Sequence, residues 1–475
     1  MRPVPVTSGG LDIAGVTADS RRVAPGYLFA ALPGSHEDGR RYIAEAVSRG
    51  AVAVLAPEGT SWPPGVPPRP LLQDPEPRRR LAQLAAALAG IQPRVVVAVT
   101  GTNGKTSTAE FLRQLWAANG RPAASLGTLG LIAPGFDPGP GLTTPDPVSL
   151  AETLSEIARA GIQHAAIEAS SHGLDQFRLD GVRLAAGAFT NLTRDHLDYH
   201  GSLNAYRQAK LRLFADLLPS GAPVVASSAM DAATLSVLAD IAARRRLDLR
   251  TVGDAGRAIR IVAVQPRPDG QLLRLDAAGI RREVMLPLPG RFQVDNALMA
   301  AALAMAVGER DVLDQLSALQ GVRGRLELAA RLPNGAAVYV DYAHTPDALE
   351  RLLVALRPHT AGRLHVVFGA GGDRDRGKRP LMGAAAARFA DVAIVTDDNP
   401  RSEDPGAIRA AILAACPGAR EIGDRRRAIA EALMGLRPGD ALAVAGKGHE
   451  QGQTIGNTII PFDDVDVVRR LVAHD

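Results

Sequence analysis

The chain has 475 residues, of which 46% are hydrophobic and 22% charged, and its formal net charge is +4 at pH 7. This length predicts about three domains. Its apolar runs are shorter than the roughly 20 residues that a membrane span needs, and we expect no signal segment at the N-terminus. The basic residues are scattered, and the one cysteine, Cys416, cannot form an internal disulfide. We therefore expect a cytoplasmic monomer with no nucleic-acid partner and no membrane partner.

Lysine is rare in this chain. Of 54 basic residues only four are lysines, namely Lys105, Lys210, Lys378 and Lys447. Lysine differs from arginine most where a compact charge or a nucleophilic primary amine is needed. Each lysine is therefore a candidate for chemistry, although chance retention is an alternative.

The first part of the chain, residues 1–92, is predicted to be a small α/β domain. Short β-like runs such as 52–55 alternate there with turns and with a Pro-rich stretch at 62–70. A helix follows, because apolar residues recur with the 3.6-residue period up to Gly90, which is typical of a helix end.

The second part, residues 93–326, alternates continuous apolar runs with helical segments. The runs are VVVAVT, HAAIEAS, GAFTNL and PVVASSA, which begin at residues 95, 164, 187 and 223. Such runs predict a mostly parallel sheet covered on both faces. Residues 254–285 are predicted to form a β-hairpin excursion from this domain.

A second series of apolar runs predicts another α/β domain at 327–475. Its runs are AVYVDYA, LHVVFGAGG, VAIVTDD and ALAVAGKGHE, and an amphipathic helix around Leu349 and Leu356 follows the first of them. Polar clusters follow the carboxyl ends of these runs, where open α/β sheets bind their ligands.

A glycine-rich loop at 100–107 follows the apolar run at 95–99 and precedes a helical segment. This order is typical of loops that hold phosphates with backbone N–H groups, although Val99 replaces the first glycine of the general pattern. Lys105 is expected to reach the β- and γ-phosphates, and the Thr106 hydroxyl to bind Mg²⁺. The predicted ATP-binding residues of the loop are Thr102, Asn103, Gly104, Lys105, Thr106 and Ser107.

The string T-G-T-N-G-K-T-S of this loop resembles the phosphate loop of the Mur ligases, and similar segments run from Thr17 to about Asp464. The resemblance implies a UDP-binding N-terminal domain, a central P-loop ATPase-type domain and a C-terminal Rossmann-like domain. It also implies ATP and Mg²⁺ as cofactors, and small-molecule substrates as partners.

The resemblance further implies a catalytic and metal-binding centre. Glu168 and His196 are similar to metal-binding positions of the family, and Thr106 and Lys210 complete the expected ligands. Lys210 lies in AYRQAKLRLF, which resembles the segment whose lysine reacts with CO₂ to give N6-carboxylysine, an anion able to bind Mg²⁺. The implied catalytic residues are Lys105, Lys210, His196 and Glu168.

Four more residues are implied to bind ATP, namely Asn296, Arg325, Asp341 and His344. Arg325 also suits a hinge, at which domain closure would complete the phosphate site.

Binding of a UDP-linked precursor is implied by segments near the N-terminus and after two central strands. The expected contacts are Ser20, Thr143, Thr144, Ser170, Gln176 and Arg178. Their hydroxyl and guanidinium groups suit directed hydrogen bonds to a dipeptide and its carboxylates. A role in turns and helix caps is the alternative. Arg40 stands where the family commonly has histidine.

The string D-N-P-R at 398–401 matches the family signature for adding meso-diaminopimelate, whose extra carboxylate would pair with Arg401. The implied contacts of this amino acid are Arg374, Asp398, Asn399, Arg401, Gly446 and Glu450. Glu450 is expected to hold the distal ammonium group. The resemblance gives Lys378 and Lys447 no role.

The implied activity is that of an ATP-dependent, ADP-forming ligase of peptidoglycan synthesis. It would add meso-diaminopimelate to UDP-N-acetylmuramoyl-L-alanyl-D-glutamate through an acyl phosphate. Two alternatives stay open, a lysine-adding relative and a catalytically silent UDP-nucleotide-binding protein of the same fold. Folylpolyglutamate synthases also share the loop and the metal centre, so these two features alone do not identify the substrate.

Overall fold

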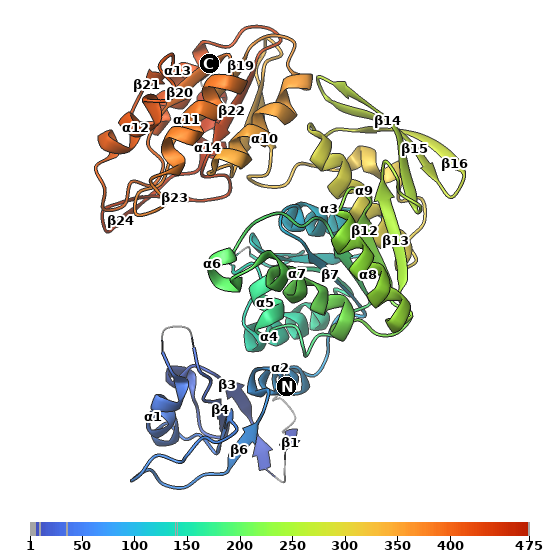
Figure 1. Ribbon diagram of the computed structural model, residues 1–475, viewed down its shortest axis with the longest axis vertical. Coiled ribbons are helices and arrows are strands. Elements are labelled where there is room, and N and C mark those ends of the chain that lie inside the picture. The colour runs from blue at the N-terminus through green and yellow to red at the C-terminus, as the bar shows by residue number, and fades with distance from the viewer. Residues whose placement is uncertain (1–5, 9–10, 35–36, 138, 140, 474–475) are drawn as a thin grey trace. The chain divides into compact units, whose positions relative to one another are not determined.

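The computed structural model describes residues 6–8, 11–34, 37–137, 139 and 141–473. The chain divides into two compact units, one formed by residues 1–260 and 298–312 and the other by residues 261–297 and 313–475 (Figure 1). Parallel sheets flanked by helices occur in both, so the predicted α/β class is confirmed. No helix in the described part of the chain is long and apolar enough to cross a membrane.

The first unit begins with a small parallel sheet. Its four strands are β3 (Gly15–Thr17), β4 (Tyr27–Ala30), β5 (Ala53–Pro57) and β6 (Leu71–Asp74), flanked by α1 (Ile43–Ser48) and preceded by a hairpin of β1 (Val6–Ser8) and β2 (Leu11–Ile13). Helix α2 (Pro77–Ala89) begins at a proline and ends at Gly90, as predicted. Its buried face, which includes Leu81 and Leu84, packs in one cluster with Leu28 and with Val148 of the next domain.

A larger sheet occupies the rest of the first unit. Its strands are β7 (Val95–Thr100), β8 (Ala123–Gly127), β9 (Gly130–Ile132), β10 (His164–Glu168), β11 (Ala186–Phe189), β12 (Pro223–Ser227) and β13 (Asp248–Gly253). All pair in parallel except β9, and the order is β14-β13-β12-β11-β7-β10-β8-β9, where β14 (Ile259–Arg267) begins in this unit. The predicted strands are thus confirmed. The chain fills one side of β7 with β8 and β10 and then the other side with β11, and ligands of open α/β sheets bind at such a reversal.

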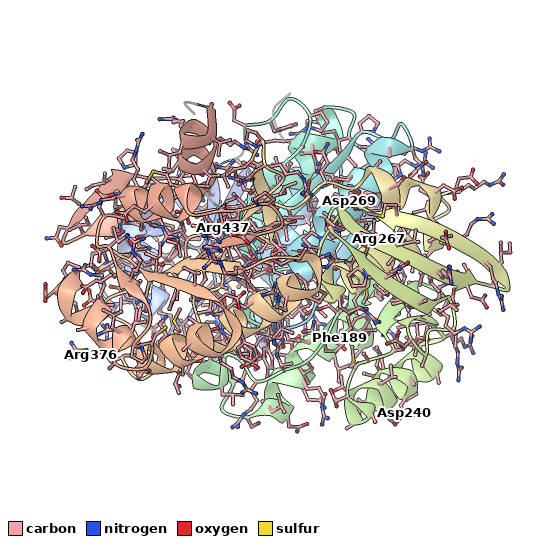
Figure 2. The ribbon with its side chains drawn as sticks, turned by 90° about the horizontal axis from the view of Figure 1, so that it is seen from above. Phe189, Asp240, Arg267, Asp269, Arg376 and Arg437 are labelled. Atoms are coloured by element: carbon pink, nitrogen blue, oxygen red, sulfur yellow. The ribbon has the colours of Figure 1, made fainter. Side chains whose placement is uncertain are left out.

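Helices cover this sheet on both faces (Figure 1). They are α3 (Lys105–Ala118), α4 (Pro147–Arg159), α5 (Ser171–Asp175), α6 (Leu197–His200), α7 (Leu203–Arg212) and α8 (Ala232–Arg245). Figure 2 shows Phe189 in the interior and Asp240 of α8 at the surface, and Phe189 has no exposed area. The β-branched and alanine residues of the strands fill the layer between sheet and helices.

The second unit contains the antiparallel pair β15 (Gly270–Ala277) and β16 (Ile280–Leu286), which confirms the predicted hairpin excursion. Its main sheet has the order β17-β18-β22-β19-β20-β21, parallel except for β17. The bounds are β17 (Glu327–Arg331), β18 (Ala337–Asp341), β19 (Leu364–Phe368), β20 (Val392–Val395), β21 (Arg420–Glu421) and β22 (Ala441–Ala445). The four strands predicted for this domain are therefore present.

The helices of the second unit cover both faces of its main sheet (Figure 1). They are α10 (Pro346–Leu356), α11 (Lys378–Phe389), α12 (Pro405–Leu413), α13 (Arg425–Met434) and α14 (Asp464–Ala473), while α9 (Arg291–Ala306) begins in this unit. Leu349, Leu352, Leu353 and Leu356 of α10 are buried, as their spacing predicted. The domain boundaries at 92 and 326 stay predictions.

Candidate active site

The predicted phosphate loop joins the end of β7 to the start of α3, at the reversal of strand order in the first unit. Gly101 has φ +146°, and a Cβ at this residue would lie 1.8 Å from Thr190 Oγ1. Gly104 has φ +85° and caps α3. Both glycines are required by the backbone, so the loop places the N-terminus of α3 beside the strand end, which favours an anionic ligand.

The loop is held by a segment that follows β11, and the sequence prediction missed this support. Thr102 N donates to Asn191 O (2.9 Å) and Asn103 N donates to Asn191 Oδ1 (3.0 Å). Thr190 Oγ1 donates to Asn103 O (2.6 Å), and Thr193 N donates to Thr102 Oγ1 (3.0 Å). The string T-N-L-T at 190–193 has no hallmark of such a role, yet its hydroxyls and amide fix the conformation of the loop.

Two of the four lysines meet at the carbonyl of Gly101. Lys105 Nζ donates to this oxygen (3.0 Å) and to Thr102 O (2.8 Å), and Lys210 Nζ donates to Gly101 O (2.7 Å). Lys210 is fully buried, with Nζ 4.4 Å from the centre of the Tyr206 ring. Burial, aided by the charge of Lys105, lowers the pKa of Lys210 well below its usual range. Lys210 is thereby disposed to be a neutral amine, the form that reacts as a nucleophile.

Glu168 lies at the end of β10 and is 3% exposed. Its Oε1 accepts a hydrogen bond from Thr128 N (2.8 Å), and a Cβ at Gly127 would lie 2.1 Å from the same oxygen. Thr144 Oγ1 donates to Glu168 O (2.8 Å). The carboxylate is thus fixed by neighbouring loops at the same strand-end edge as the phosphate loop.

His196 is more exposed than Glu168 and has different neighbours. Its side chain is about half exposed, its φ is +50°, and its ring lies beside the Asp195 carboxylate (3.5 Å) and the His172 ring (4.9 Å between centroids). Within the described part of the chain, no three His, Cys, Asp or Glu side chains are arranged to hold a metal ion. Mg²⁺ usually keeps several water ligands and binds few protein groups, so it does not require three such side chains. Hydroxyl and carboxylate oxygens are donors that fit Mg²⁺.

A cavity of about 380 Å³ lies between the small sheet and the larger sheet of the first unit. Its lining includes Thr17, Asp19, Arg22, Arg78, Leu81, Leu142, Asp146, Gln176 and Arg178. A neighbouring cavity of about 410 Å³ shares Arg78 and Gln176 with it and reaches Asp175 and Tyr199. Three arginines beside leucine side chains suit a ligand with anionic and apolar parts. Arg22 and Arg78 were not predicted as contacts.

The predicted precursor-binding residues fall into two groups. Gln176 and Arg178 line the first cavity, and Arg178 Nη1 donates to Thr144 O (2.6 Å). The four other hydroxyls have protein partners: Ser20 donates to Glu45 (2.8 Å), Thr143 bonds Thr128 (3.1 Å), Thr144 is bound as above, and Ser170 caps α5 through Gly173 N (3.0 Å). The cap and turn roles considered above are therefore present in the structure.

Arg40, the departure from the family pattern, is paired with Asp38 at 2.6 Å on the surface. Hydrogen bonds from Arg40 lower the pKa of Asp38 to about 2. Residues 35 and 36 of the same segment lie outside the described residues.

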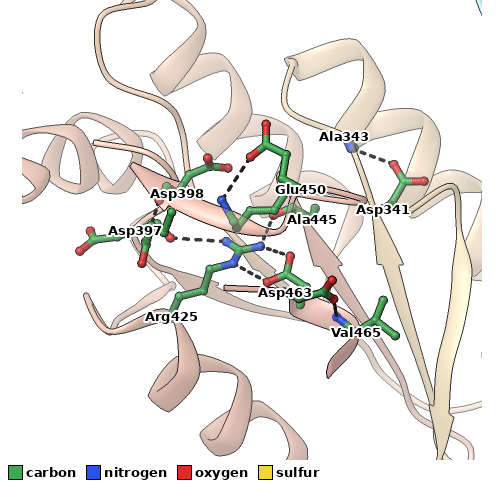
Figure 3. Close-up of polar contacts among 12 residues, drawn as sticks. Asp341, Ala343, Asp397, Asp398, Arg425, Ala445, Glu450, Asp463 and Val465 are labelled. Atoms are coloured by element: carbon green, nitrogen blue, oxygen red, sulfur yellow. Dashed lines mark hydrogen bonds and ion pairs between the residues drawn. The ribbon is translucent and has the colours of Figure 1, made fainter. Parts of the chain in front are cut away.

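The four remaining predicted ATP contacts lie in the second unit. Asp341 accepts hydrogen bonds from Leu326 N (2.7 Å) and Ala343 N (2.8 Å, Figure 3), and burial, opposed by Arg325, raises its pKa to about 6. Arg325 lies over the Tyr342 ring (5.1 Å), and His344 Nδ1 lies 2.8 Å from Tyr342 O. Gln293 joins Asn296 to this group, because it donates to Arg325 O (3.0 Å) and accepts from Asn296 (3.5 Å).

All six residues predicted to bind the added amino acid gather at one end of the main sheet of the second unit. Asn399 Nδ2 donates to Glu450 Oε2 (2.8 Å), and a Cβ at Gly446 would lie 2.4 Å from Asp398 Oδ2. A Cβ at Gly371 would lie 2.8 Å from Arg401 Nη1 and 3.8 Å from Arg374 Cγ. Residues up to 76 positions apart, counted from 374 to 450, thus lie together at this sheet end.

A buried ion pair lies beside these residues. Arg425 and Asp464 are paired at 2.7 Å with no exposed side-chain area, and Arg425 Nη2 also donates to Ala445 O (3.0 Å). Figure 3 shows Arg425 close to Asp398 and Glu450. Nothing in the sequence singled out this pair, because its members are separated by 39 residues and belong to no shared motif.

Arg401 has φ +51°, a strained value for a residue with a side chain. A hairpin of β23 (Gly452–Ile455) and β24 (Thr458–Pro461) holds it there, since Arg401 N donates to Thr454 O (3.1 Å) and Gly456 N donates to Arg401 O (2.7 Å). Arg401 Nη1 donates to Gly372 O (2.8 Å). The guanidinium is therefore fixed beside the Gly371–Gly372 turn.

Three family models match the chain. They are the catalytic domain of the Mur ligase family over residues 12–89, the Mur ligase middle domain over 99–304, and the Mur ligase glutamate ligase domain over 324–448.

Similar proteins span nearly the whole chain. The UDP-N-acetylmuramoyl-L-alanyl-D-glutamate–2,6-diaminopimelate ligase of Caulobacter vibrioides is 54% identical, with 95% of this chain and 94% of that protein covered. A solved structure of a ligase with the same name is 34% identical with a TM-score of 0.75, and covers 98% of this chain and 95% of its own. The MurF ligase of Thermotoga maritima shares the fold, with 18% identity, a TM-score of 0.63 and 97% of each chain covered.

Proposed function

Because the chain belongs to the Mur ligase family, whose members are ATP-dependent ligases, we propose that it joins meso-2,6-diaminopimelate to UDP-N-acetylmuramoyl-L-alanyl-D-glutamate. The observation that carries this proposal is the gathering of Arg374, Asp398, Asn399, Arg401 and Glu450 at one sheet end. Arg401 offers a fixed guanidinium for a carboxylate that lysine lacks. Relatives with the same substrate in their names support the choice.

The proposed reaction has two steps. A carboxylate oxygen of the bound D-glutamate attacks the γ-phosphorus of ATP, the bond to the β-γ bridging oxygen breaks, and ADP leaves. The amine of diaminopimelate then attacks the acyl carbon of the acyl phosphate, loses a proton, and expels phosphate as the amide forms. Neither step needs a nucleophilic side chain, so the protein contributes positioning and electrostatic stabilisation.

Residues of both units have proposed roles in the first step. Lys105, whose ammonium donates to two carbonyls of the phosphate loop, is proposed to neutralise charge on the transferred phosphoryl group. Thr106, Glu168 and His196 are the proposed Mg²⁺ ligands, and bound Mg²⁺ would neutralise phosphate charge. Asn296, Arg325, Asp341 and His344 are proposed to bind ATP. Six residues are proposed to bind the precursor, namely Ser20, Thr143, Thr144, Ser170, Gln176 and Arg178. Of these, Gln176 and Arg178 line the first cavity.

Lys210 is proposed to carry a carbamate. Its neutral amine would attack the carbon of CO₂ and lose a proton, which gives an anionic oxygen ligand in place of a cation. Full burial, the depressed pKa and the adjacent Lys105 support this proposal, because they disfavour the ammonium form and favour an anion. Mass spectrometry of the native protein should show the mass of one added CO₂ that is lost in the variant Lys210→Arg.

The proposal places the reaction in the cytoplasm, where ATP is available, and treats the chain as a monomer. The test is phosphate release by the purified protein with Mg-ATP and the UDP-linked dipeptide, with meso-diaminopimelate or L-lysine supplied in parallel. Turnover with diaminopimelate is expected, with little from lysine at the same concentration. Preference for lysine would identify a lysine-adding enzyme, and ligand-induced thermal stabilisation without turnover would identify a silent binding protein.

Arg401 provides the specificity test within this assay. Removing a charged hydrogen-bond partner costs about 1.5 to 3 kcal/mol, so Arg401→Ala should lower kcat/KM for diaminopimelate about 10- to 100-fold. Arg401→Lys is the matched control, because it keeps the charge but not the bidentate geometry. Equal loss for diaminopimelate and lysine in Arg401→Ala would contradict the assigned role.

A further inference from the structure

Lys447 is a fully buried lysine to which the family resemblance gave no role. It follows β22, and its Nζ lies 3.0 Å from Asn399 Oδ1 and 3.1 Å from Glu450 Oε2. Asn399 Nδ2 closes the triangle with a 2.8 Å hydrogen bond to the same oxygen of Glu450. One lysine thus connects two of the residues proposed to bind the added amino acid.

These contacts fix which way each side chain points. Asn399 Oδ1 accepts from Lys447 and also from Thr454 N (2.9 Å), so a flipped amide would place its NH₂ group against two donors. Glu450 Oε2 accepts from both Lys447 and Asn399. Among the described residues Glu450 Oε1 receives no hydrogen bond, which makes it the oxygen available to a ligand.

Lys447 belongs to a group of charged side chains at this sheet end. Lys447 is paired with Glu450, whose side chain is 32% exposed, and Arg425 is paired with the fully buried Asp464. Asp398 lies near Arg425 and also near Lys378. Figure 3 shows Arg425, Asp398 and Glu450 together at the sheet end. Without Lys447 the Glu450 carboxylate would lose its paired cation, and an unpaired charge is penalised at a partly buried position.

We propose that Lys447 is a positioning residue for the added diamino acid, which holds Asn399 and Glu450 Oε2 so that Glu450 Oε1 faces the distal ammonium group. This inference rests on the proposed function. Lysine is suited to the position because its compact ammonium donates in three directions, whereas a planar guanidinium needs more room than a side chain with no exposed area has. It also explains why one of only four lysines stands here.

The test compares Lys447→Met with the native enzyme by steady-state kinetics. The expected result is a KM for meso-diaminopimelate raised about 10- to 100-fold, the range for residues that orient a ligand-binding side chain, with the KM values for ATP and the UDP-linked dipeptide unchanged. Lys447→Arg should show a similar increase despite its retained charge. An unchanged KM for diaminopimelate in Lys447→Met, with the native enzyme active, would overturn the inference but not the proposed function.

A double variant separates positioning from a purely structural role. If Lys447 acts through Glu450, then adding Lys447→Met to Glu450→Gln should change the KM for diaminopimelate less than twofold, that is, within about 0.4 kcal/mol. A further tenfold rise would show that Lys447 acts by another route and would overturn the inference. The double variant can be measured even if Lys447→Met alone does not fold, because Glu450→Gln removes the carboxylate that would otherwise be left without its cation.

Two controls complete the experiment. Arg427 forms a comparable pair with Glu431 at 3.0 Å on the exposed side of α13, so Arg427→Met should leave every KM unchanged. L-Lysine, tested at high concentration, shares the distal ammonium but lacks the carboxylate. Lys447→Met should therefore lower the use of both amino acids by the same factor, and a changed ratio between them would contradict the assigned contact with the ammonium.

Discussion

Lys210 of the first unit and Lys447 of the second are both fully buried, yet their surroundings are opposite. Lys210 Nζ meets a backbone carbonyl and lies near a second lysine, while Lys447 Nζ meets a carboxylate and an amide oxygen. Burial of an ammonium without an anion favours the neutral amine, whereas burial beside an anion gives an ion pair. Equal burial therefore favours a neutral amine at Lys210 and a fixed ion pair at Lys447.

The largest effect should come from the ion pair that supports the second site. Asp464→Asn leaves the Arg425 guanidinium buried without its anion, which should lower the free energy of unfolding by about 3 to 5 kcal/mol. Urea unfolding of the full chain measures this change. Asp466→Asn in the same helix is exposed and should cost under about 1 kcal/mol. Equal losses of unfolding free energy in the two variants would contradict a stabilising role for the buried Arg425–Asp464 pair.

The next effect concerns the phosphate loop. Lys105→Ala removes the cation at the Gly101 carbonyl and should lower kcat about 100- to 1,000-fold, as expected for loss of a group that stabilises transition-state charge. Phosphate release under saturating substrates measures it. Lys105→Arg is the control that restores the charge, and it should recover part of the rate if charge is what matters.

Lys210→Arg tests the amine itself. Arginine places a permanent cation at this position and cannot form a carbamate, so activity should fall about 10- to 100-fold, the range for lost metal-site groups. Native activity should rise when bicarbonate is added to CO₂-depleted buffer, and the variant should not respond. A full response in Lys210→Arg would exclude the carbamate as its cause.

The smallest effect is the pH dependence of stability in CO₂-depleted buffer. The folded-state pKa of Lys210 lies below its ordinary value of 10.5, so the unfolded chain binds more protons between these two values. Stability contributed by this group should therefore rise with pH up to about 10.5 and fall as pH decreases. The difference in unfolding free energy between the native protein and Lys210→Met should follow this trend, and a flat difference would contradict the depressed pKa.

Much of the fold was predictable from local pattern. The apolar runs at 95–100 and 364–368 became strands, and the helix at 77–89 ended at Gly90, because period, caps and breakers act within one element. The six residues of the amino-acid site were also predicted, and the structure brings them together because each follows the end of a strand or starts a turn in one sheet. Their individual roles stay predictions.

Other parts of the site depended on contacts between distant residues. Thr190 and Asn191 hold a phosphate loop that lies about 90 residues earlier, and their string has no hallmark of such a role. Arg22 and Arg78 line the cavity only because the small sheet and α2 pack against the next domain. The hydroxyls of Ser20 and Ser170 were predicted as ligand contacts, and the structure gives them protein partners.

By itself the sequence determined the α/β elements, the glycine loop and the scarcity of lysine, because these follow from residue type, spacing and count along the chain. Only the tertiary structure decided what each buried lysine meets. Lys210 finds a carbonyl 109 residues away and Lys447 an amide oxygen 48 residues away. Charge state and orientation in a buried site depend on the nearest partners in space, and chain-local patterns do not specify those partners.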